Sequence, residues 1–290
     1  MIQIRRTAHT AVKREGAAVE RNVAGEMEYL TFPLLEKTGV ARHLFTTRLG
    51  GVSRGEFAAM NFSVDRGDRR ECVLENYRRV GEVLKCAPED MTASCQTHTT
   101  NIRRVTSADR GKGIVRPRDY GDVDGLMTNE PGLALVTFYA DCVPLYFVDP
   151  VNRAIGLAHS GWRGTAEGMG ECMVQAMGRC FGSRPGELYA AIGPSICREC
   201  YEVGEDVASR FGDRFGEGVV LPGREPGKYQ LDLWLANLEI LKRAGVPEEQ
   251  IAVTDICTCH NPDYLFSHRA SGGRRGNMGA FLALGQAGET

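Results

Sequence analysis

Five short, almost entirely apolar runs constrain the fold of this chain most strongly. Unbroken apolar runs of four to eight residues are typical of buried β-strands, because a helix needs a longer segment and a half-exposed strand alternates with polar residues. These segments are residues 132–139, 143–148, 154–159, 187–193 and 251–254. We therefore expect a fold built around buried β-sheet.

Helical periodicity appears in other parts of the chain, at 71–86, 165–181, 203–215 and 231–244. A charged, glycine-rich stretch at 107–123 is expected to form a surface loop or an insertion. Strands and helices are interspersed without the regular βαβ alternation of a doubly wound fold. The pattern predicts a layered α/β (α+β) domain with mixed β-sheets flanked by helices.

The domain organisation follows from composition along the chain. Residues 1–28 are polar and alternate weakly, so we expect an N-terminal arm or a short hairpin there. Beyond residue 28 no repeat, low-complexity tract or Pro/Ser-rich linker interrupts the sequence. Residues 29–290 are therefore predicted to form one domain.

Charge and cysteine content limit the function classes. The chain has 35 Lys+Arg and 37 Asp+Glu, so electrostatics favour neither a nucleic-acid nor a membrane-surface partner. No apolar run approaches the roughly 20 residues that cross a bilayer, and no export signal is recognised. We expect a cytoplasmic protein whose ten cysteines are mostly free thiols, one or two of them doing chemistry.

In three places a metal-binding side chain lies in or beside a predicted tight turn. They contain Cys95 to His98, Asp141 with Cys142, and His159 in HSGWRG. Imidazole and thiolate are preferred zinc ligands, and three protein ligands leave a fourth position open, as in catalytic sites. From spacing alone each residue could instead be a packed or solvated side chain. Cys142 and His159 flank a pair of strands, which can bring both to the same sheet edge.

Ten segments carry a more specific signal because they occur in a fixed order. They are FTTRLGGVS (45–53), MNFS (60–63), QTH (96–98), ADCVPLYFVD (140–149), AHSGWRGT (158–165), AAIGPSI (190–196) with CYEVG (200–204), LDL (231–233), ICT (256–258) and FSHR (266–269). Together they resemble the YfiH/YlmD family, also called the laccase-domain or purine nucleoside phosphorylase family, over roughly residues 30–285. The resemblance implies a catalytic domain whose zinc ligands fall on His98, Cys142 and His159.

The resemblance also implies the activity and the small-molecule partners. It points to phosphorolysis of adenosine, inosine and 5′-methylthioadenosine, with purine nucleoside and phosphate as substrates, and to deamination of adenosine. Zinc with an open position can activate water for deamination. The sequence identifies no protein partner.

Four further residues are candidates for the chemistry around the metal. Arg48, beside a Gly-Gly turn, and Arg163, at a helix start, are expected to bind phosphate, unless each pairs with a carboxylate. Asp141 is expected to accept a hydrogen bond from a ligand histidine or to act as a general acid/base, unless it only forms a turn. Asn61 is a weaker candidate for sugar binding. His268 stands where the family usually has Tyr.

Three alternative functions stay open. A laccase-like, copper-dependent polyphenol oxidase is disfavoured, because six histidines without a His-x-His pair cannot build a multicopper site, although copper could replace zinc. A hydrolase or amidase would use Cys142 as nucleophile and His159 as base. A non-catalytic zinc module would need a fourth ligand, such as one from the 257–260 segment.

A second group of cysteines has metal-ligand spacing of its own. Cys197 and Cys200 form C-x-x-C, and Cys257, Cys259 and His260 add three potential ligands. They could form a second, structural zinc site, or the first pair could be a redox dithiol. The resemblance implies no second metal, so ordinary free thiols are the favoured expectation.

Overall fold

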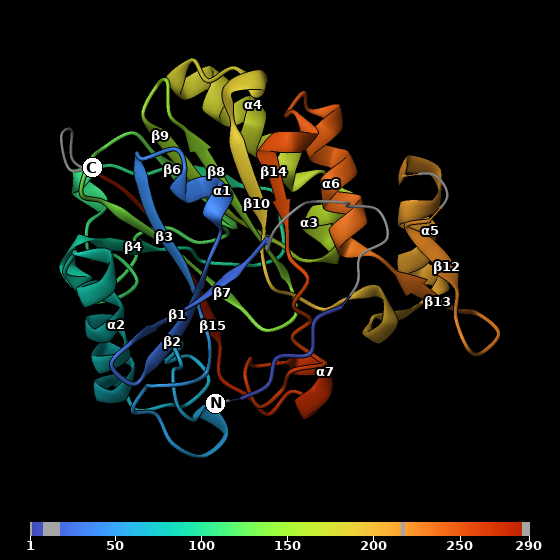
Figure 1. The fold of residues 1–290 in the computed structure, drawn as a ribbon, viewed down its shortest axis with the longest axis horizontal. Coiled ribbons are helices and arrows are strands. Elements are labelled where there is room, and N and C mark those ends of the chain that lie inside the picture. The colour runs from blue at the N-terminus through green and yellow to red at the C-terminus, as the bar shows by residue number, and fades with distance from the viewer. Residues whose placement is uncertain (1, 8–17, 216–217, 286–290) are drawn as a thin grey trace.

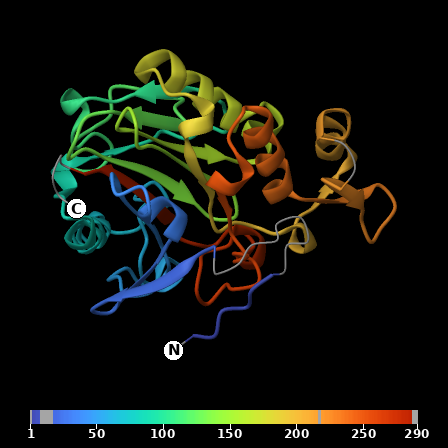
Figure 2. The same ribbon diagram turned by 45° about the horizontal axis from the view of Figure 1, so that its top comes forward.

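Two six-stranded sheets packed face to face form the core of the molecule, with one long helix on the outer side of the first sheet and several helices on the outer side of the second (Figures 1 and 2). The structure is a computed structural model, and it describes residues 2–7, 18–215 and 218–285. Within these ranges every helix is too short or too polar to span a lipid bilayer. The predicted layered α/β fold with mixed sheets is confirmed.

The first sheet has the strand order β1-β2-β3-β15-β7-β4. Only β4 and β7 run parallel; the other neighbours are antiparallel. Its strands are β1 (Glu20–Ala24), β2 (Met27–Thr31), β3 (Ala41–Thr46), β4 (Met91–Ala93), β7 (Ala134–Tyr139) and β15 (Met278–Leu284). Strand β15, from the end of the chain, therefore lies in the middle of the sheet.

The second sheet has the strand order β14-β10-β8-β9-β6-β5, with parallel pairs only at its two edges. Its strands are β5 (Ile102–Arg104), β6 (Gly125–Thr128), β8 (Val143–Asp149), β9 (Ala154–Ser160), β10 (Tyr189–Ile192) and β14 (Ile251–Val253). A small antiparallel sheet contains β11 (Glu202–Gly204), β12 (Val220–Pro222) and β13 (Lys228–Leu231). Together with α5 it lies at one side of the molecule (Figure 1).

The helices cover the outer faces of the two large sheets. Helix α2 packs on the first sheet, whereas α3, α4 and α6 pack on the second (Figure 1). The helices are α1 (Pro33–Glu36), α2 (Arg70–Leu84), α3 (Trp162–Ala166), α4 (Met169–Phe181), α5 (Glu205–Phe215), α6 (Leu233–Arg243) and α7 (His268–Ser271).

The five apolar runs correspond to β7, β8, β9, β10 and β14, and their burial on two faces explains why they contain so few polar residues. In β8, Leu145 and Phe147 face the helix layer, while Tyr146 and Val148 face the other sheet. Strands β3 and β15 were not among the predicted strands, although β15 is apolar throughout.

The predicted helices are present, with one break. The segment 165–181 is divided into α3 and α4 at Gly168, whose φ of +83° belongs to the left-handed region that favours glycine. Residues 203 and 204 belong to β11, so the helix predicted from 203 begins at Glu205. Asp232 caps α6 by accepting a hydrogen bond from the backbone N–H of Leu235 (3.0 Å).

Two segments show how polar stretches are accommodated. The predicted loop at 107–123 has one short 3₁₀ turn, but it contains the ion pair of the buried Lys112 Nζ with Asp109 Oδ1 at 2.8 Å. Within 1–28, residues 8–17 lie outside the described residues. The β1–β2 hairpin begins at Glu20 and continues to Thr31, so it crosses the proposed domain boundary, which stays a prediction.

Candidate metal centre and active site

The structure brings the three predicted metal ligands together at one end of the sheets. His98 lies in the segment after β4, Cys142 in the turn between β7 and β8, and His159 in β9. Their ligating atoms all lie within 4.8 Å of one another. His159 is buried, Cys142 half-buried and His98 exposed, so the group is open on one side.

Strand register explains why Cys142 and His159 meet. β8 and β9 are antiparallel, and Pro144 is the direct partner of His159. Cys142 precedes Pro144 by two residues, so the start of β8 and the end of β9 lie at the same edge. The backbone of Asp141 in this turn has φ +87°, and His98 has φ +67°. Such conformations are costly for non-glycine residues and are often found at functional sites.

Packing around the three side chains leaves little spare room. Cys142 Sγ lies 4.0 Å from His98 Nε2, and the two imidazole rings meet edge to face with centroids 4.9 Å apart. A Cβ added at Gly161 would lie 2.9 Å from His98 Cδ2 and 3.2 Å from Cys142 Sγ. Residue 161 therefore has to be glycine for the three ligating atoms to keep this arrangement.

Asp124 is one of the site residues that sequence reasoning missed. Its carboxylate accepts a hydrogen bond from His159 Nδ1 at 2.7 Å, and it also accepts from the backbone N–H groups of Thr97, His98 and Thr99 at 2.9–3.1 Å. One carboxylate thus orients His159 and shapes the loop of His98. No local motif distinguishes Asp124; only the pairing of β6 with β9 brings it beside His159.

The electrostatics favour charge separation between Cys142 and His159. Burial opposes ionisation of both groups, but their mutual attraction wins. The charge of His159, with hydrogen bonds from both histidines, lowers the pKa of the Cys142 thiol to about 6. The charge of Cys142 and the Asp124 carboxylate raise the pKa of His159 to about 9. At neutral pH, with no metal bound, the pair is therefore a Cys142 thiolate beside a protonated His159 whose ring Asp124 orients.

Asp141 has partners other than the ligand histidines. Its Oδ1 accepts a hydrogen bond from the Thr258 hydroxyl at 2.6 Å, and its Oδ2 accepts from the backbone N–H of Arg269 at 2.7 Å. The carboxylate that contacts a ligand histidine is thus Asp124, and an acid–base role for Asp141 stays a prediction. His268 lies exposed at the start of α7.

The side chains of Arg48, Arg163 and Asn61 are engaged with the protein itself. Arg48 donates to the carbonyl oxygens of Ala58 (2.9 Å) and Pro262 (2.7 Å). The guanidinium of Arg163 lies 4.4 Å from the centroid of the adjacent Trp162 ring. The buried Asn61 amide binds backbone and side-chain groups of the 61–68 loop and accepts from the N–H of residue 277 (2.8 Å). Their substrate-binding roles stay predictions.

A cavity of about 270 Å³ contains the three predicted ligands together with three arginines, Arg66, Arg118 and Arg275. Its lining is formed by Ser63, Asp65, Arg66, Ser94, Cys95, Gln96, His98, Arg118, Phe138, Ala140, Cys142, His159, Arg275 and Asn277. Burial and the neighbouring charge of Arg66 lower the pKa of Arg275 to about 10, so it stays protonated at neutral pH. Sequence reasoning did not single out these arginines, since no motif places them beside the cluster.

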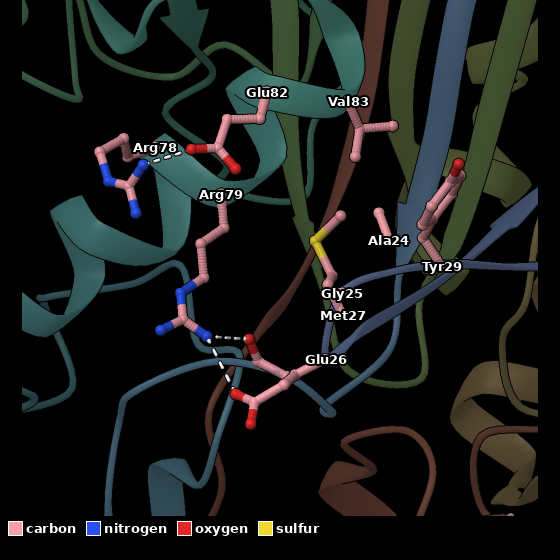
Figure 3. A pocket seen from close by; sticks show the side chains of 10 residues that line it. Ala24, Gly25, Glu26, Met27, Tyr29, Arg78, Arg79, Glu82 and Val83 are labelled. Carbon is pink, nitrogen blue, oxygen red and sulfur yellow. Dashed lines mark hydrogen bonds and ion pairs between the residues drawn. The ribbon is translucent and has the colours of Figure 1, made fainter.

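A larger hollow of about 620 Å³ lies between the β1–β2 hairpin and α2 (Figure 3). Its charged residues are paired: Arg78 with Glu82, and Arg79 with Glu26 and the carbonyl of Gly50. Among the described residues, neither a histidine nor a cysteine lines it. The smaller cavity is therefore the candidate active site, because it combines reactive side chains with unusual pKa values.

Comparisons with known proteins agree with this architecture. The family model described as multi-copper polyphenol oxidoreductase laccase matches residues 42–285. Purine nucleoside phosphorylase YlmD of Geobacillus stearothermophilus is 41% identical over 243 residues, covering 82% of this chain and 88% of that protein. Purine nucleoside phosphorylase of Deinococcus radiodurans is 37% identical over 263 residues, covering 89% and 96%.

Two solved structures have the same fold. The crystal structure of YlmD from Geobacillus stearothermophilus matches with a TM-score of 0.85 at 36% identity, covering 93% of this chain and 100% of that one. The Bacillus licheniformis hypothetical protein YfiH matches with a TM-score of 0.83 at 35% identity, covering 90% and 97%. The chain therefore belongs to the laccase-domain family that includes the YlmD and YfiH proteins.

Proposed function

We propose that the protein is a zinc-dependent purine nucleoside phosphorylase for adenosine, inosine and 5′-methylthioadenosine, with adenosine deamination as a second activity. The observation that carries the proposal is the convergence of His98, Cys142 and His159 with three arginines in one cavity. Relatives named purine nucleoside phosphorylase support the reaction class.

The residues of the cluster fit a zinc ion. Two imidazoles and one thiolate are ligands that zinc prefers, and the hydrogen bond of His159 Nδ1 to Asp124 leaves Nε2 as its ligating atom. When bound, zinc supplies a Lewis acid with a fourth position for water or substrate. Copper(II) could bind the same three ligands, but three ligands do not make a multicopper centre.

The cavity arginines supply what phosphorolysis requires from the protein. A phosphate oxygen forms a bond to C1′ of the ribose while the bond from C1′ to the purine breaks, and the base leaves with the electron pair. Arg66, Arg118 and Arg275 can neutralise and orient phosphate, because a guanidinium forms paired hydrogen bonds to its oxygens. Positioning of this kind supplies much of the rate in such reactions.

The earlier candidates take a secondary place in this proposal. Arg48, Arg163 and Asn61 would have to leave the contacts described above before they could bind phosphate or sugar. We assign phosphate to Arg66, Arg118 and Arg275 first, because these three arginines line the same cavity as His98, Cys142 and His159. Asp141 is kept as the proposed acid–base residue, because it precedes Cys142 directly.

We also keep a cytoplasmic location as part of the proposal. All ten cysteines lie among the described residues and each is a free thiol, which suits a reducing compartment.

The first test separates the two proposed activities. Zinc-replete protein is incubated with adenosine, with and without phosphate, and the products are separated by chromatography. Adenine that forms only with phosphate, and not with His98→Ala, would establish the phosphorylase. Inosine formed without phosphate would establish deamination. Copper-dependent oxygen uptake with a phenol, in the absence of either product, would support an oxidase instead.

The phosphate assignment is tested by a pair of neighbouring arginines. Arg275→Gln should raise KM for phosphate about 10- to 100-fold, because a hydrogen bond to a charged group contributes about 1.5–3 kcal/mol. Arg274→Gln is the matched control, since Arg274 is 85% exposed and pairs with Glu56. Initial rates at varied phosphate give KM. Equal KM values for both variants and the wild type would remove Arg275 from the phosphate site.

A Cys–His hydrolase is a second candidate. It is favoured by the spatial arrangement in which Asp124 binds His159 and His159 lies beside Cys142, and by the lowered pKa of the Cys142 thiol. It predicts rapid alkylation of Cys142 by iodoacetamide in metal-free protein and a covalent acyl intermediate, both read by mass spectrometry. Nucleoside activity that a chelator abolishes and zinc restores would contradict it.

A further inference from the structure

A second group of metal-ligating side chains lies outside the candidate active site. It consists of Cys197, Cys200, Cys257 and His260, whose ligating atoms all lie within 4.8 Å of one another. Cys197 and Cys257 are buried, while the other two are half-buried. The three thiols are free. Nothing in the proposed phosphorylase chemistry uses these four residues.

Local backbone structure holds the four side chains in place. Cys197 and Cys200 flank a 3₁₀ turn that is closed by the hydrogen bond from Cys200 N–H to the Cys197 carbonyl (3.1 Å). Cys257 pairs with Ser195 in an isolated parallel bridge. The following turn is closed by Asn261, whose Nδ2 donates to the Cys257 carbonyl at 2.8 Å. Two tight turns thus present two ligands each, which is common in structural zinc sites.

The distances suit a tetrahedral zinc ion. Zn–S bonds of about 2.3 Å and Zn–N bonds of about 2.0–2.1 Å place ligand atoms about 3.6–3.8 Å apart. Cys197 Sγ lies 3.8 Å from His260 Nδ1. The Cys197 N–H donates to Cys257 Sγ at 3.3 Å, which stabilises negative charge on that sulfur. The hydroxyl of Thr7 also lies 3.3 Å from His260 Nδ1, and zinc would replace this contact.

An exposed carboxylate lies near His260 on its other side, beyond hydrogen-bond distance. Glu199 Oε2 lies 3.7 Å from His260 Nε2, while Nδ1 faces the thiols. A carboxylate behind a ligand histidine is a common feature of metal sites, because it fixes the ring and raises the basicity of the ligating nitrogen.

We propose that Cys197, Cys200, Cys257 and His260 hold a structural zinc ion. Four protein ligands close the coordination sphere, in contrast to the open three-residue cluster. Three thiolates with one imidazole favour zinc over harder ions such as Mg²⁺ or Ca²⁺. The three thiols release their protons to solvent when they bind the ion. A redox dithiol would need only Cys197 and Cys200, and it would not explain why the 257–260 turn converges on them.

The position of this second ion gives it a role in the candidate active site. The Ile196 N–H donates to the Asp141 carbonyl (3.0 Å), and the Thr258 hydroxyl donates to the Asp141 carboxylate (2.6 Å). Ile196 precedes Cys197, and Thr258 follows Cys257. An ion that joins these two turns therefore also holds the Asp141 backbone, whose φ is +87°, and with it the adjacent Cys142.

The test counts zinc in the full-length protein, purified under reducing conditions from zinc-supplemented cells, by elemental analysis and native mass spectrometry. The His98→Ala variant, whose first site is disabled, should keep about one zinc ion per chain. Co²⁺ that replaces this ion should show absorption from thiolate-to-cobalt charge transfer. No retained metal in His98→Ala would overturn the proposal, whatever the nucleoside assays give.

Variants of the second cluster identify the ligands. In the His98→Ala background, Cys200→Ser and Cys257→Ser should each lose the remaining ion and the cobalt absorption. Cys259→Ser is the matched control and should retain both. Loss in Cys259→Ser, or retention in both other variants, would overturn the ligand assignment. A chain mass two hydrogens lower in the native protein would reveal a disulfide instead of a metal site.

Discussion

Asp124 connects two parts of the candidate metal centre, so its replacement should weaken metal binding without removing a ligand. In Asp124→Asn the neutral amide no longer holds His159 in its ligating tautomer, and we expect zinc affinity to fall about 10- to 100-fold. Competition with a chromophoric chelator measures the affinity. Asp122→Asn is the control, because the exposed Asp122 bonds to hydroxyl and amide groups of the same loop but not to His159. Equal losses in both variants would contradict this role for Asp124.

The candidate site was predictable only where a residue belongs to a motif. His98, Cys142 and His159 each stand in a distinctive segment, and the structure brings them together. Asp124 and Arg275 belong to no such segment, and long-range pairing alone places them near the cluster. Arg48 shows the same limit. An arginine beside a Gly-Gly turn is compatible both with an anion site and with the backbone contacts that Arg48 makes here, and the motif alone does not distinguish the two.

Among the helices and strands, those strands that are buried on both faces were the easiest to predict from the sequence. Runs such as β8 are apolar because both faces are covered, and they were recognised. The break between α3 and α4 was not, since a glycine inside a helical pattern does not reveal its φ. The loop predicted at 107–123 is present, but its charged residues are not all exposed, because Asp109 and Lys112 are buried against each other.

This buried pair predicts a pH-dependent contribution to stability. Burial opposes ionisation of Asp109, but hydrogen bonds from Lys112, the Thr106 N–H and Arg103 lower its pKa to about 2. Because the pKa in the folded state lies below the ordinary 3.8, the stabilisation is present above about pH 4 and is lost as the pH falls towards 2. It amounts to about 2 kcal/mol, from 1.36 kcal/mol per pKa unit.

Asp109→Asn should therefore lower the free energy of unfolding at pH 7, and its difference from the wild type should shrink below about pH 4. Urea titrations at several pH values measure both. Asp119→Asn removes the other partner of Lys112, but Asp119 is 65% exposed, so it should have little effect. A deficit for Asp109→Asn that is constant down to pH 2 would show that lost packing, not charge, is responsible.

At the scale of the whole molecule, the order of the strands within each sheet could not be predicted from the sequence. Local patterns predicted layers and mixed sheets, but not that β15 would lie between β3 and β7. That position joins residues more than 200 apart, such as Phe281 and its partner Leu44. The last strand thus completes the sheet that the first strands begin, and this closure favours one cooperative unit over separate halves.

A hydrogen bond between the two large sheets tests that cooperativity. Tyr146 of β8 is fully buried, and its hydroxyl donates to the Leu44 carbonyl of β3 at 3.0 Å. Tyr146→Phe should cost about 1–2 kcal/mol and lower Tm by about 2–6 °C. Tyr229→Phe is the control, because its hydroxyl bonds to Glu205 at the edge of the small sheet.

Two probes reveal whether both layers respond to the loss of that bond. Far-UV circular dichroism follows all secondary structure, whereas the only two tryptophans, Trp162 and Trp234, lie in the helix layer on the second sheet. If the sheets unfold as one unit, Tyr146→Phe shifts both transitions equally. A tryptophan transition that stays at the wild-type temperature, while the dichroism midpoint falls, would mean that the first sheet and α2 melt on their own. The candidate metal centre would then lie between two parts that unfold separately, since His98 follows a strand of the first sheet and His159 belongs to the second.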